Sequence, residues 1–472
     1  MVDLSRPFTL LATLLARLGI IERDRLTATV DLAWPRVLTG FAIMSKQTAD
    51  LAMVGLAIGA PAVAGLAFAG AYWTVGKFVA IGLAGGTVGL VSQNYGGGES
   101  GRAALLVKQS VWVAILLAIP VVGLYVAAAE PLIGLLSSDA PAVGYGTTYL
   151  RLVAPALLFE FLNMIASRTY AGVSDTFTPM VIRAGGAVIN VALSGTLIFG
   201  FGWGVAGAAV GTAVATATVT LAFSWGMFGR AYFGRGASPV ALSLTGPQLD
   251  RELLTQLIRV STPLIARRLA QGIATFPLLA ITASFGSATV AALEVGRRVR
   301  NLANSASWGF SIASSTLVGQ ALGRGEEREA TAYGTQIISL AFVVHLLVAG
   351  GVILLADPIA SVFVDDPAAV ALSATFVIVS AISLVALAVD GSATGALRGA
   401  GDTRIPFYAS LIGLYVFTLP VAYLGTVTAL GVTALYVALV VETAVPAAVT
   451  LWRFRTGAWR AVSRDYRPSA ET

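Results

Sequence analysis

The sequence contains no cysteine and only one histidine, His345, among its 472 residues. Without cysteine the chain has no disulfide and no thiolate metal site, and a single histidine excludes a histidine metal cluster within one chain. The sequence also has no P-loop, no HExxH motif and no Ser-His-Asp set. The missing P-loop argues against ATP hydrolysis, and a single histidine excludes most mechanisms of general acid–base catalysis. We therefore expect neither an enzyme nor a bound cofactor.

Charged residues are scarce as well. They make up 11% of the chain, against about 25% in soluble domains, while 57% of the residues are apolar. The mean hydropathy is +0.82. A chain of this composition cannot cover a globule with polar surface, so we expect it to lie in a lipid bilayer. The net charge of +6 does not indicate a nucleic acid partner, because the basic residues are concentrated in alternate loops.

Twelve apolar runs are long enough to span a bilayer, which takes about 20 residues each. They are near residues 31–58, 62–93, 102–128, 142–171, 177–199 and 204–227, and then 260–284, 288–321, 330–355, 368–397, 405–424 and 431–452. Arginines such as Arg102, Arg230 and Arg324 follow the even-numbered runs, whereas the opposite loops are uncharged or acidic. Because basic residues favour cytoplasmic loops, this predicts a multi-pass protein of the cell membrane with both termini in the cytoplasm.

The two halves share short motifs at a fixed offset, which indicates an internal repeat. YAGVSDTFTPM and LRGAGDTRIPF place Asp175 and Asp402 227 residues apart (402 − 175), and VSQNYGGGE and VGQALGRGE repeat at the same offset. We predict an all-α integral membrane protein of twelve transmembrane helices in two six-helix lobes, related by a pseudo-two-fold axis along the membrane normal. The predicted parts are an N-terminal lobe (1–228), a cytoplasmic linker (229–259), a C-terminal lobe (260–455) and a cytoplasmic tail (456–472).

The first apolar run contains two opposite charges, Lys46 and Asp50, which are one helical turn apart and hence on one face. A charge at the centre of a spanning helix costs about 2.5–3.5 kcal/mol, so such residues usually face a bundle interior or a water-filled cavity. A static ion pair that fixes helix packing is the structural alternative to a functional role. We take this pair as the leading functional candidate.

Residues 31–99 and 165–212, together with the matching motifs in the second half, resemble the multidrug and toxin extrusion (MATE) transporters. The shared features are TADLAMVGLAIGAPAVAGL in the first helix, GLVSQNYGGGE at the end of the second, and the loops AGVSDTFTPM and LRGAGDTRIP. We expect glycine to permit the tight turn in these loops, and Asp402 and Thr403 to cap the following helix. The resemblance implies a secondary active transporter that exports organic compounds, often cationic and amphipathic, by proton- or sodium-coupled antiport.

The resemblance also implies a cation site in the N-terminal half. Similar transporters use an aspartate in the first helix, an asparagine and an aspartate four residues apart in the fifth, and a threonine in the sixth. These match Asp50, Asn190 and Thr212, whereas Ser194 replaces the second aspartate. One carboxylate beside Lys46 suits a hard cation poorly, so we expect proton coupling, with Na⁺ near Asp50, Asn190 and Thr212 as the alternative. Our hypothesis is that Asp50 and Lys46 form a coupling switch that a proton or a charged substrate opens.

Further polar residues inside the predicted helices mark a substrate cavity: Gln47, Lys77, Glu160, Asn163, Ser167 and Asp390. Basic residues are at least as numerous as acidic ones among the intramembrane charges, so organic anions or zwitterions are an alternative to drug cations. A lipid-linked oligosaccharide flippase of the same two-lobe plan is a second alternative, and a channel or scaffold is a third. As partners we expect a small organic substrate and the lipid bilayer, with no nucleic acid, and we expect a monomer.

Overall fold

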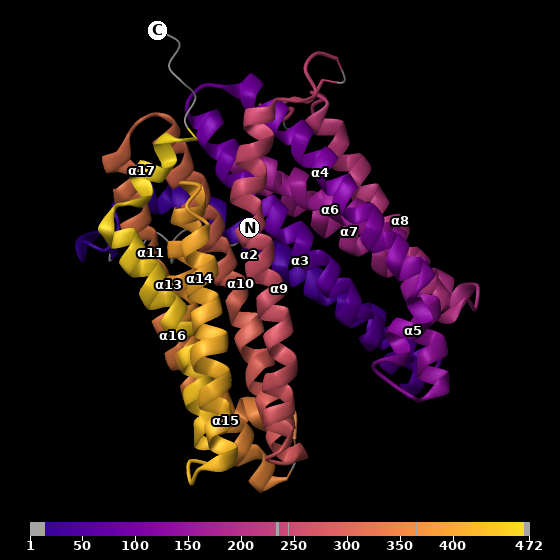
Figure 1. Cartoon of the computed structure of the whole chain (residues 1–472). Helices are drawn as coiled ribbons and strands as arrows, with labels where there is room; N and C mark the ends of the chain where they lie inside the picture. Colours follow the sequence, from indigo (N-terminus) through magenta and orange to yellow (C-terminus); the bar gives the residue numbers. More distant parts are fainter. Residues whose placement is uncertain (1–14, 233–235, 244, 365, 467–472) are drawn as a thin grey trace. The chain divides into compact units, whose positions relative to one another are not determined.

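The computed structural model describes residues 15–232, 236–243, 245–364 and 366–466. The long regular elements of this part of the chain are helices (Figure 1), as expected where the backbone must satisfy its own hydrogen bonds in lipid. In chain order they are α2 (Arg23–Ala57), α3 (Ala60–Gly96), α4 (Ser100–Ala127), α5 (Ala129–Gly134), α6 (Ala140–Gly172), α7 (Phe177–Gly195), the π-helix η1 (Thr196–Gly200), α8 (Gly204–Met227), α9 (Arg251–Ala283), α10 (Ser287–Gly323), α11 (Glu327–Leu354), α12 (Ala356–Ser361), α13 (Pro367–Gly399), α14 (Arg404–Leu411), the π-helix η2 (Ile412–Thr418), α15 (Leu419–Val427), α16 (Thr433–Thr456) and α17 (Trp459–Arg464).

The described helices include 10 that are long and apolar enough to cross a membrane. α2 and α10 are also long, at 35 and 37 residues, but polar and charged residues interrupt their apolar runs, and neither belongs to this set. The structure thus confirms an all-helical, multi-pass membrane protein. The count of twelve spans, which needs α2 and α10 as well, stays a prediction.

The helix bounds repeat at the offset that the sequence motifs predict. α10 begins and ends 227 residues after α3 (287 − 60 and 323 − 96), and α13 is displaced from α6 by the same number (367 − 140 and 399 − 172). The caps repeat as well: Asp139 accepts a hydrogen bond from the Ala142 amide at 3.2 Å, and Asp366 accepts one from the Ala369 amide at 2.9 Å. The repeat is therefore a repeat of structure as well as of sequence.

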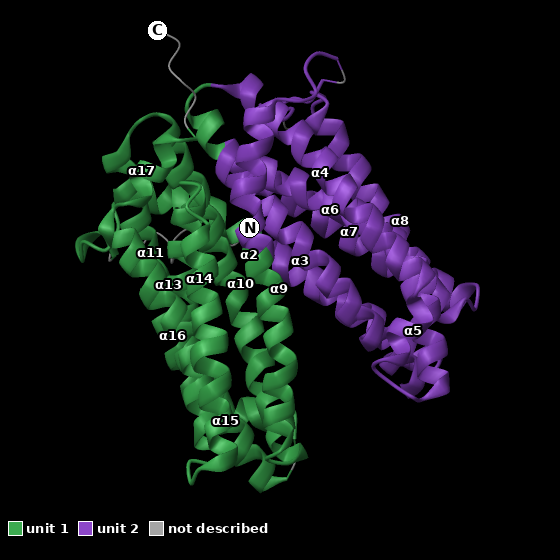
Figure 2. Cartoon of the chain, viewed as in Figure 1, with its two compact units in different colours: residues 1–37, 92–98, 266–472 green, residues 38–91, 99–265 purple. Residues whose placement is uncertain are grey.

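The chain forms two compact units (Figure 2). Unit 1 contains residues 1–37, 92–98 and 266–472, and unit 2 contains residues 38–91 and 99–265. The division falls inside α2, α3 and α9, so each of these helices contributes to both units. The predicted lobe boundaries at 228, 259 and 455 stay predictions. Residues 233–235 and 244 of the predicted linker and 467–472 of the predicted tail, like both chain termini, lie outside the described residues.

Each unit is built around one central helix. In unit 2, α6 packs against α4 and α8, and α7 packs against α8. In unit 1, α13 packs against α10, α11 and α16. Alanine supplies many of the fully buried positions in these helices, as at Ala208, Ala393 and Ala396. Small side chains let helix backbones approach closely, which is the main source of packing energy between helices in lipid.

The two matching loops before α7 and α14 differ in their hydrogen bonds. Asp175 accepts from the Thr178 amide at 2.9 Å and so caps α7, whereas Asp402 accepts from Arg453 Nε at 2.6 Å. Thr403 stands at the N-cap of α14 without a side-chain capping bond, so the prediction that Asp402 and Thr403 cap this helix was wrong. Burial raises the pKa of the Asp402 carboxyl, and the Arg453 guanidinium opposes that rise. The ion pair anchors the loop to α16 in place of a cap.

Candidate functional site: a buried carboxylate and a polar pocket

Asp50 lies on α2 within unit 2 and is only 6% exposed. Its neighbours come from two other helices, with Asn190 and Ser194 on α7 and Thr212 on α8, all buried. Thr212 Oγ1 donates a hydrogen bond to Asp50 Oδ2 at 3.3 Å. The structure therefore brings together the four residues that the resemblance assigned to a cation site.

The Asn190 amide lies between Asp50 and Thr212, and one of its two orientations satisfies both of its polar groups. In that orientation the amide nitrogen donates to both Asp50 oxygens at 3.1 Å, and the amide oxygen can accept from Thr212 Oγ1 at 3.0 Å and from the Thr212 amide nitrogen at 3.2 Å. In the opposite orientation the amide oxygen would face the Asp50 carboxylate and the amide nitrogen would face the Thr212 N–H. The satisfied orientation suits an ionised Asp50.

A glycine sets the distance between α7 and α8 at this point. A Cβ at Gly211 would lie 2.5 Å from Ser194 Oγ and 2.8 Å from the Ser194 amide nitrogen, so only glycine allows this approach. The approach places Thr212, the next residue, within reach of Asn190. Ser194 itself lies beside Asp50, close enough to act on the carboxylate, although its buried Oγ makes no hydrogen bond of regular geometry.

The described residues contain no group of three or more histidine, aspartate or glutamate side chains that could hold a metal ion. Asp50 is the one carboxylate in the cluster with Asn190, Ser194 and Thr212. Hydroxyl and amide hydrogens can point at its oxygens, whereas a sodium ion needs several oxygen atoms pointing at itself. Tyr149 on α6, which the sequence did not single out, is a further neighbour of Asp50 and Thr212.

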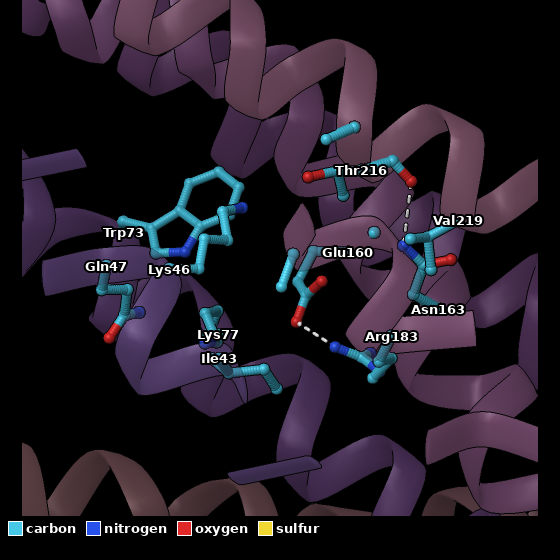
Figure 3. Close-up of a pocket in the computed structure, with 13 residues that line it drawn as sticks. Ile43, Lys46, Gln47, Trp73, Lys77, Glu160, Asn163, Arg183, Thr216 and Val219 are labelled. Carbon is cyan, nitrogen blue, oxygen red and sulfur yellow. Dashed lines mark hydrogen bonds and ion pairs between the residues drawn. The ribbon is translucent and has the colours of Figure 1, made fainter. Parts of the chain in front are cut away.

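A polar pocket of about 60 Å³ lies in the same unit. It is lined from α2, α3, α6, α7 and α8 by Ile43, Lys46, Gln47, Trp73, Lys77, Glu160, Asn163, Arg183, Gly186, Ala187, Ala215, Thr216 and Val219. In Figure 3, Lys46, Gln47 and Trp73 lie on one side of the pocket, and Glu160, Asn163 and Arg183 on the other. The pocket thus collects charged side chains from helices that are far apart in sequence.

The pocket and the Asp50 cluster are one helical turn apart on three helices at once. The paired positions are Lys46 and Asp50 on α2, Gly186 and Asn190 on α7, and Thr216 and Thr212 on α8. Four residues rise about 6 Å along a helix axis. Thr216 Oγ1 also donates to the Thr212 carbonyl at 2.6 Å. The Asp50 cluster and the pocket wall are therefore built from the same three helices.

Two buried residues on the pocket wall have unused hydrogen-bonding atoms. Arg183 Nη1 donates to Glu160 Oε1 at 3.3 Å, while Arg183 Nη2 has no partner. Asn163 Nδ2 donates to the Thr216 carbonyl at 3.1 Å, while Asn163 Oδ1 has no partner. Unpaired buried polar atoms are costly, so such atoms on a pocket wall suggest contact with a ligand.

Lys46 lines the pocket and also acts electrostatically on Asp50, one turn away on the same helix. Within the described part of the chain no ion pair joins Lys46 to Asp50, although the two are successive on one helix. The Asp50 hydrogen bond comes from α8, and the nearby acid in the pocket is Glu160. The structure therefore does not show the closed Asp50–Lys46 pair of our hypothesis.

The predicted cavity residues divide into three groups. Gln47, Lys77, Glu160 and Asn163 line the pocket, and Ser167 is half-buried on α6 outside its lining. Asp390 lies on α13 in unit 1, where it forms an ion pair with Arg267 and accepts from Thr450 Oγ1 at 3.2 Å. Arg183 and Trp73 line the pocket but were not predicted. A lone arginine within the apolar run IRAGGAVINVALSG was the available signal for Arg183.

A search of protein families matches this chain to the MatE family model at residues 35–196 and again at 263–424. One match falls in each half, which agrees with the internal repeat. The multidrug resistance protein PmpM of Pseudomonas aeruginosa is 26% identical over 415 residues, covering 86% of this chain and 85% of that protein.

Solved structures give the same fold. The crystal structure of a MATE protein in the bent conformation has a TM-score of 0.85 and 21% identity, covering 93% of this chain and 97% of that one. A MOP superfamily transporter from Pyrococcus furiosus, described as having a binding pocket of reverse polarity that suggests a different function, has a TM-score of 0.84 and 20% identity, covering 94% and 97%. These similarities establish the fold.

Proposed function

Because this chain belongs to the MATE family of multidrug efflux transporters, we propose that it exports small organic compounds across the cell membrane by proton-coupled antiport. Family members are transporters rather than enzymes, and they occupy the membrane with many helices. The proposal adds the coupling ion, the residues that bind it, alternating access and the orientation with both termini in the cytoplasm.

The observation that carries the proposal is the one-turn separation between the Asp50 cluster and the polar pocket. An antiporter must make substrate binding and ion binding exclude each other. Two sites that share α2, α7 and α8 can do this, because a change in helix packing at one site alters the wall of the other. The internal repeat supports alternating access, since carriers of this kind are commonly built from two related halves.

We assign the proton to Asp50. In the ionised state the carboxylate accepts from the Asn190 amide nitrogen, and the one hydrogen of the Thr212 hydroxyl goes either to the carboxylate or to the amide oxygen. In the protonated state one carboxyl oxygen becomes a donor, and the Asn190 amide turns its oxygen to accept from it. The turn also changes which group Thr212 Oγ1 faces. Protonation thereby changes the contacts among α2, α7 and α8 at the level just beside the pocket.

Sodium is the weaker alternative. Two carboxylates would suit a hard cation, but Ser194 supplies a hydroxyl in place of the second carboxylate. The Asn190 amide can also direct its N–H groups, and not its own oxygen, at Asp50. In this account Lys46 acts as the link between the two sites, because it lines the pocket one turn from Asp50. The coupling switch of our hypothesis then acts through the packing of α2, α7 and α8, which differs between the two protonation states of Asp50.

The test is transport by the purified chain in proteoliposomes. A pH gradient and a sodium gradient are imposed separately, with ethidium and 2-naphthoate as probes, in wild type and in Asp50→Asn. The proposal expects the pH gradient to drive at least one probe in wild type, and neither in Asp50→Asn. If neither gradient moves either probe, or if only sodium drives transport, the proposal is wrong.

A further inference from the structure

We infer that the polar pocket of unit 2 binds the anionic head group of an amphipathic organic carboxylate, so that this transporter exports organic anions. The inference rests on the proposed function only in treating the pocket as the substrate site. It adds the chemical class of the substrate.

Formal charge is the first support. Three cationic side chains line the pocket, Lys46, Lys77 and Arg183, against one carboxylate, Glu160. The lining residues therefore carry a formal excess of two positive charges, which an ionised Asp50, acting on Lys46 from one turn away, reduces to one. Glu160 is already engaged by Arg183 Nη1 at 3.3 Å. A ligand cation would add a like charge to this group. A ligand carboxylate would reduce the imbalance, in a region where charges are poorly screened.

An unused donor is the second support. Arg183 is 8% exposed and Nη2 has no partner. A planar guanidinium recognises carboxylates through paired N–H donors, and Glu160 occupies only one of its two terminal nitrogens. The free nitrogen can donate to a ligand oxygen without breaking the existing pair. Asn163 Oδ1 is a neutral acceptor, which fits a hydroxyl or amide hydrogen of the ligand and does not cancel the positive excess.

Size and shape are the third support. A volume of about 60 Å³ is well below the roughly 300–1,000 Å³ of pockets that enclose drug-sized ligands, so the pocket suits the head group of a ligand. Ile43, Trp73 and Val219 form the apolar part of the lining. A carboxylate with an aromatic or aliphatic body matches both parts, with its charge among the basic residues and its body against the apolar residues.

Binding to the full-length chain in detergent tests the inference. Isothermal titration calorimetry at low ionic strength compares 2-naphthoate with 2-naphthylmethylammonium, which has the same aromatic body and the opposite charge. The variants are Arg183→Gln and Lys46→Gln. Lys46→Gln leaves the Arg183–Glu160 pair intact, so the test does not depend on a variant that leaves Glu160 unpaired. The matched control is Arg151→Gln. Arg151 lies on the same helix as Glu160 and is half-exposed, and its Nη2 is 3.8 Å from Glu130 Oε2.

We expect 2-naphthoate to bind at least about tenfold more tightly than the ammonium probe. Lys46→Gln and Arg183→Gln should each weaken 2-naphthoate about tenfold, which corresponds to about 1.4 kcal/mol, while Arg151→Gln leaves it unchanged. Equal or tighter binding of the ammonium probe, no binding of 2-naphthoate, or 2-naphthoate binding that neither variant weakens would each overturn the inference. These results come from binding alone. Failure of gradient-driven transport would therefore remove the proposed function and leave the anion site standing.

Discussion

The Asn190 amide on α7 and the Asp50 carboxylate on α2 lie 3.1 Å apart, with Thr212 Oγ1 of α8 within 3.0 Å of the same amide. Three helices therefore meet at one titratable group. Because the amide can present either its oxygen or its nitrogen, the contact can accommodate both protonation states of Asp50. This relationship underlies the coupling that we propose.

Asp50→Asn should abolish ion-driven export while leaving the protein folded. The asparagine has nearly the same shape and can still accept from Thr212, but it cannot bind and release a proton at physiological pH. Gradient-driven efflux in proteoliposomes measures the loss, and the unfolding temperature in detergent checks the fold. Asp31→Asn is the control, since Asp31 is an exposed aspartate of the same helix. Equal efflux by Asp50→Asn and Asp31→Asn would contradict the assignment.

Thr212→Val and Ser194→Ala should have different effects. Thr212 Oγ1 donates to Asp50, and one such bond to a charged group is worth about 1.5–3 kcal/mol, so Thr212→Val should slow coupled efflux about tenfold or more. Ser194 Oγ lies beside Asp50 without a hydrogen bond of regular geometry, so Ser194→Ala should slow efflux less than Thr212→Val does. Initial rates at matched protein density provide the comparison. A large loss in Ser194→Ala would show that this hydroxyl acts on Asp50 during the cycle.

Gly211→Ala should weaken both stability and coupling. The added Cβ would lie 2.5 Å from Ser194 Oγ, and relieving such overpacking costs about 1–3 kcal/mol. The helices must separate, which moves Thr212 away from Asn190. Gly185→Ala on α7 is the matched control, because a Cβ there meets no atom within 4 Å. We expect a lower unfolding temperature in detergent for Gly211→Ala alone. If both variants behave as wild type, the close approach is not needed.

The sequence predicted the helices and their repeat well. The run predicted at 62–93 is α3 (Ala60–Gly96), and the 227-residue offset holds for helix ends and for the Asp139 and Asp366 caps. These features depend on local hydrophobicity and on motifs that lie close together in the chain. They are therefore readable from sequence without knowledge of tertiary contacts.

Side-chain partners across helices were less predictable. Arg183 pairs with Glu160 from a different helix, and Asp402 pairs with Arg453 in place of capping α14. Such contacts depend on how each helix is rotated about its own axis. A helix that is apolar around its whole circumference has no distinct face from which this rotation could be predicted. Asp50, Asn190 and Thr212 were identified by family resemblance. Their contacts also depend on Gly211, whose role appears only once α7 and α8 are packed.

Asp390 should behave as a structural residue. It pairs with Arg267 and accepts from Thr394 and Thr450, and removing one partner of a buried ion pair costs about 3–5 kcal/mol. Asp390→Ala should therefore lower the unfolding temperature strongly, and the double variant Arg267→Met with Asp390→Leu should recover most of the loss. The contrary result is a stable Asp390→Ala protein that has lost coupled efflux, which would make Asp390 a second coupling site.

The most direct test of the account is proton movement during transport. Proteoliposomes containing a pH-sensitive dye receive 2-naphthoate or ethidium without an imposed ion gradient, and internal pH is followed together with probe uptake. The account predicts that uptake in wild type is accompanied by proton movement in the opposite direction at a fixed ratio, and that both signals disappear in Asp50→Asn. Probe uptake without proton movement in wild type, or proton movement that persists in Asp50→Asn, would contradict it.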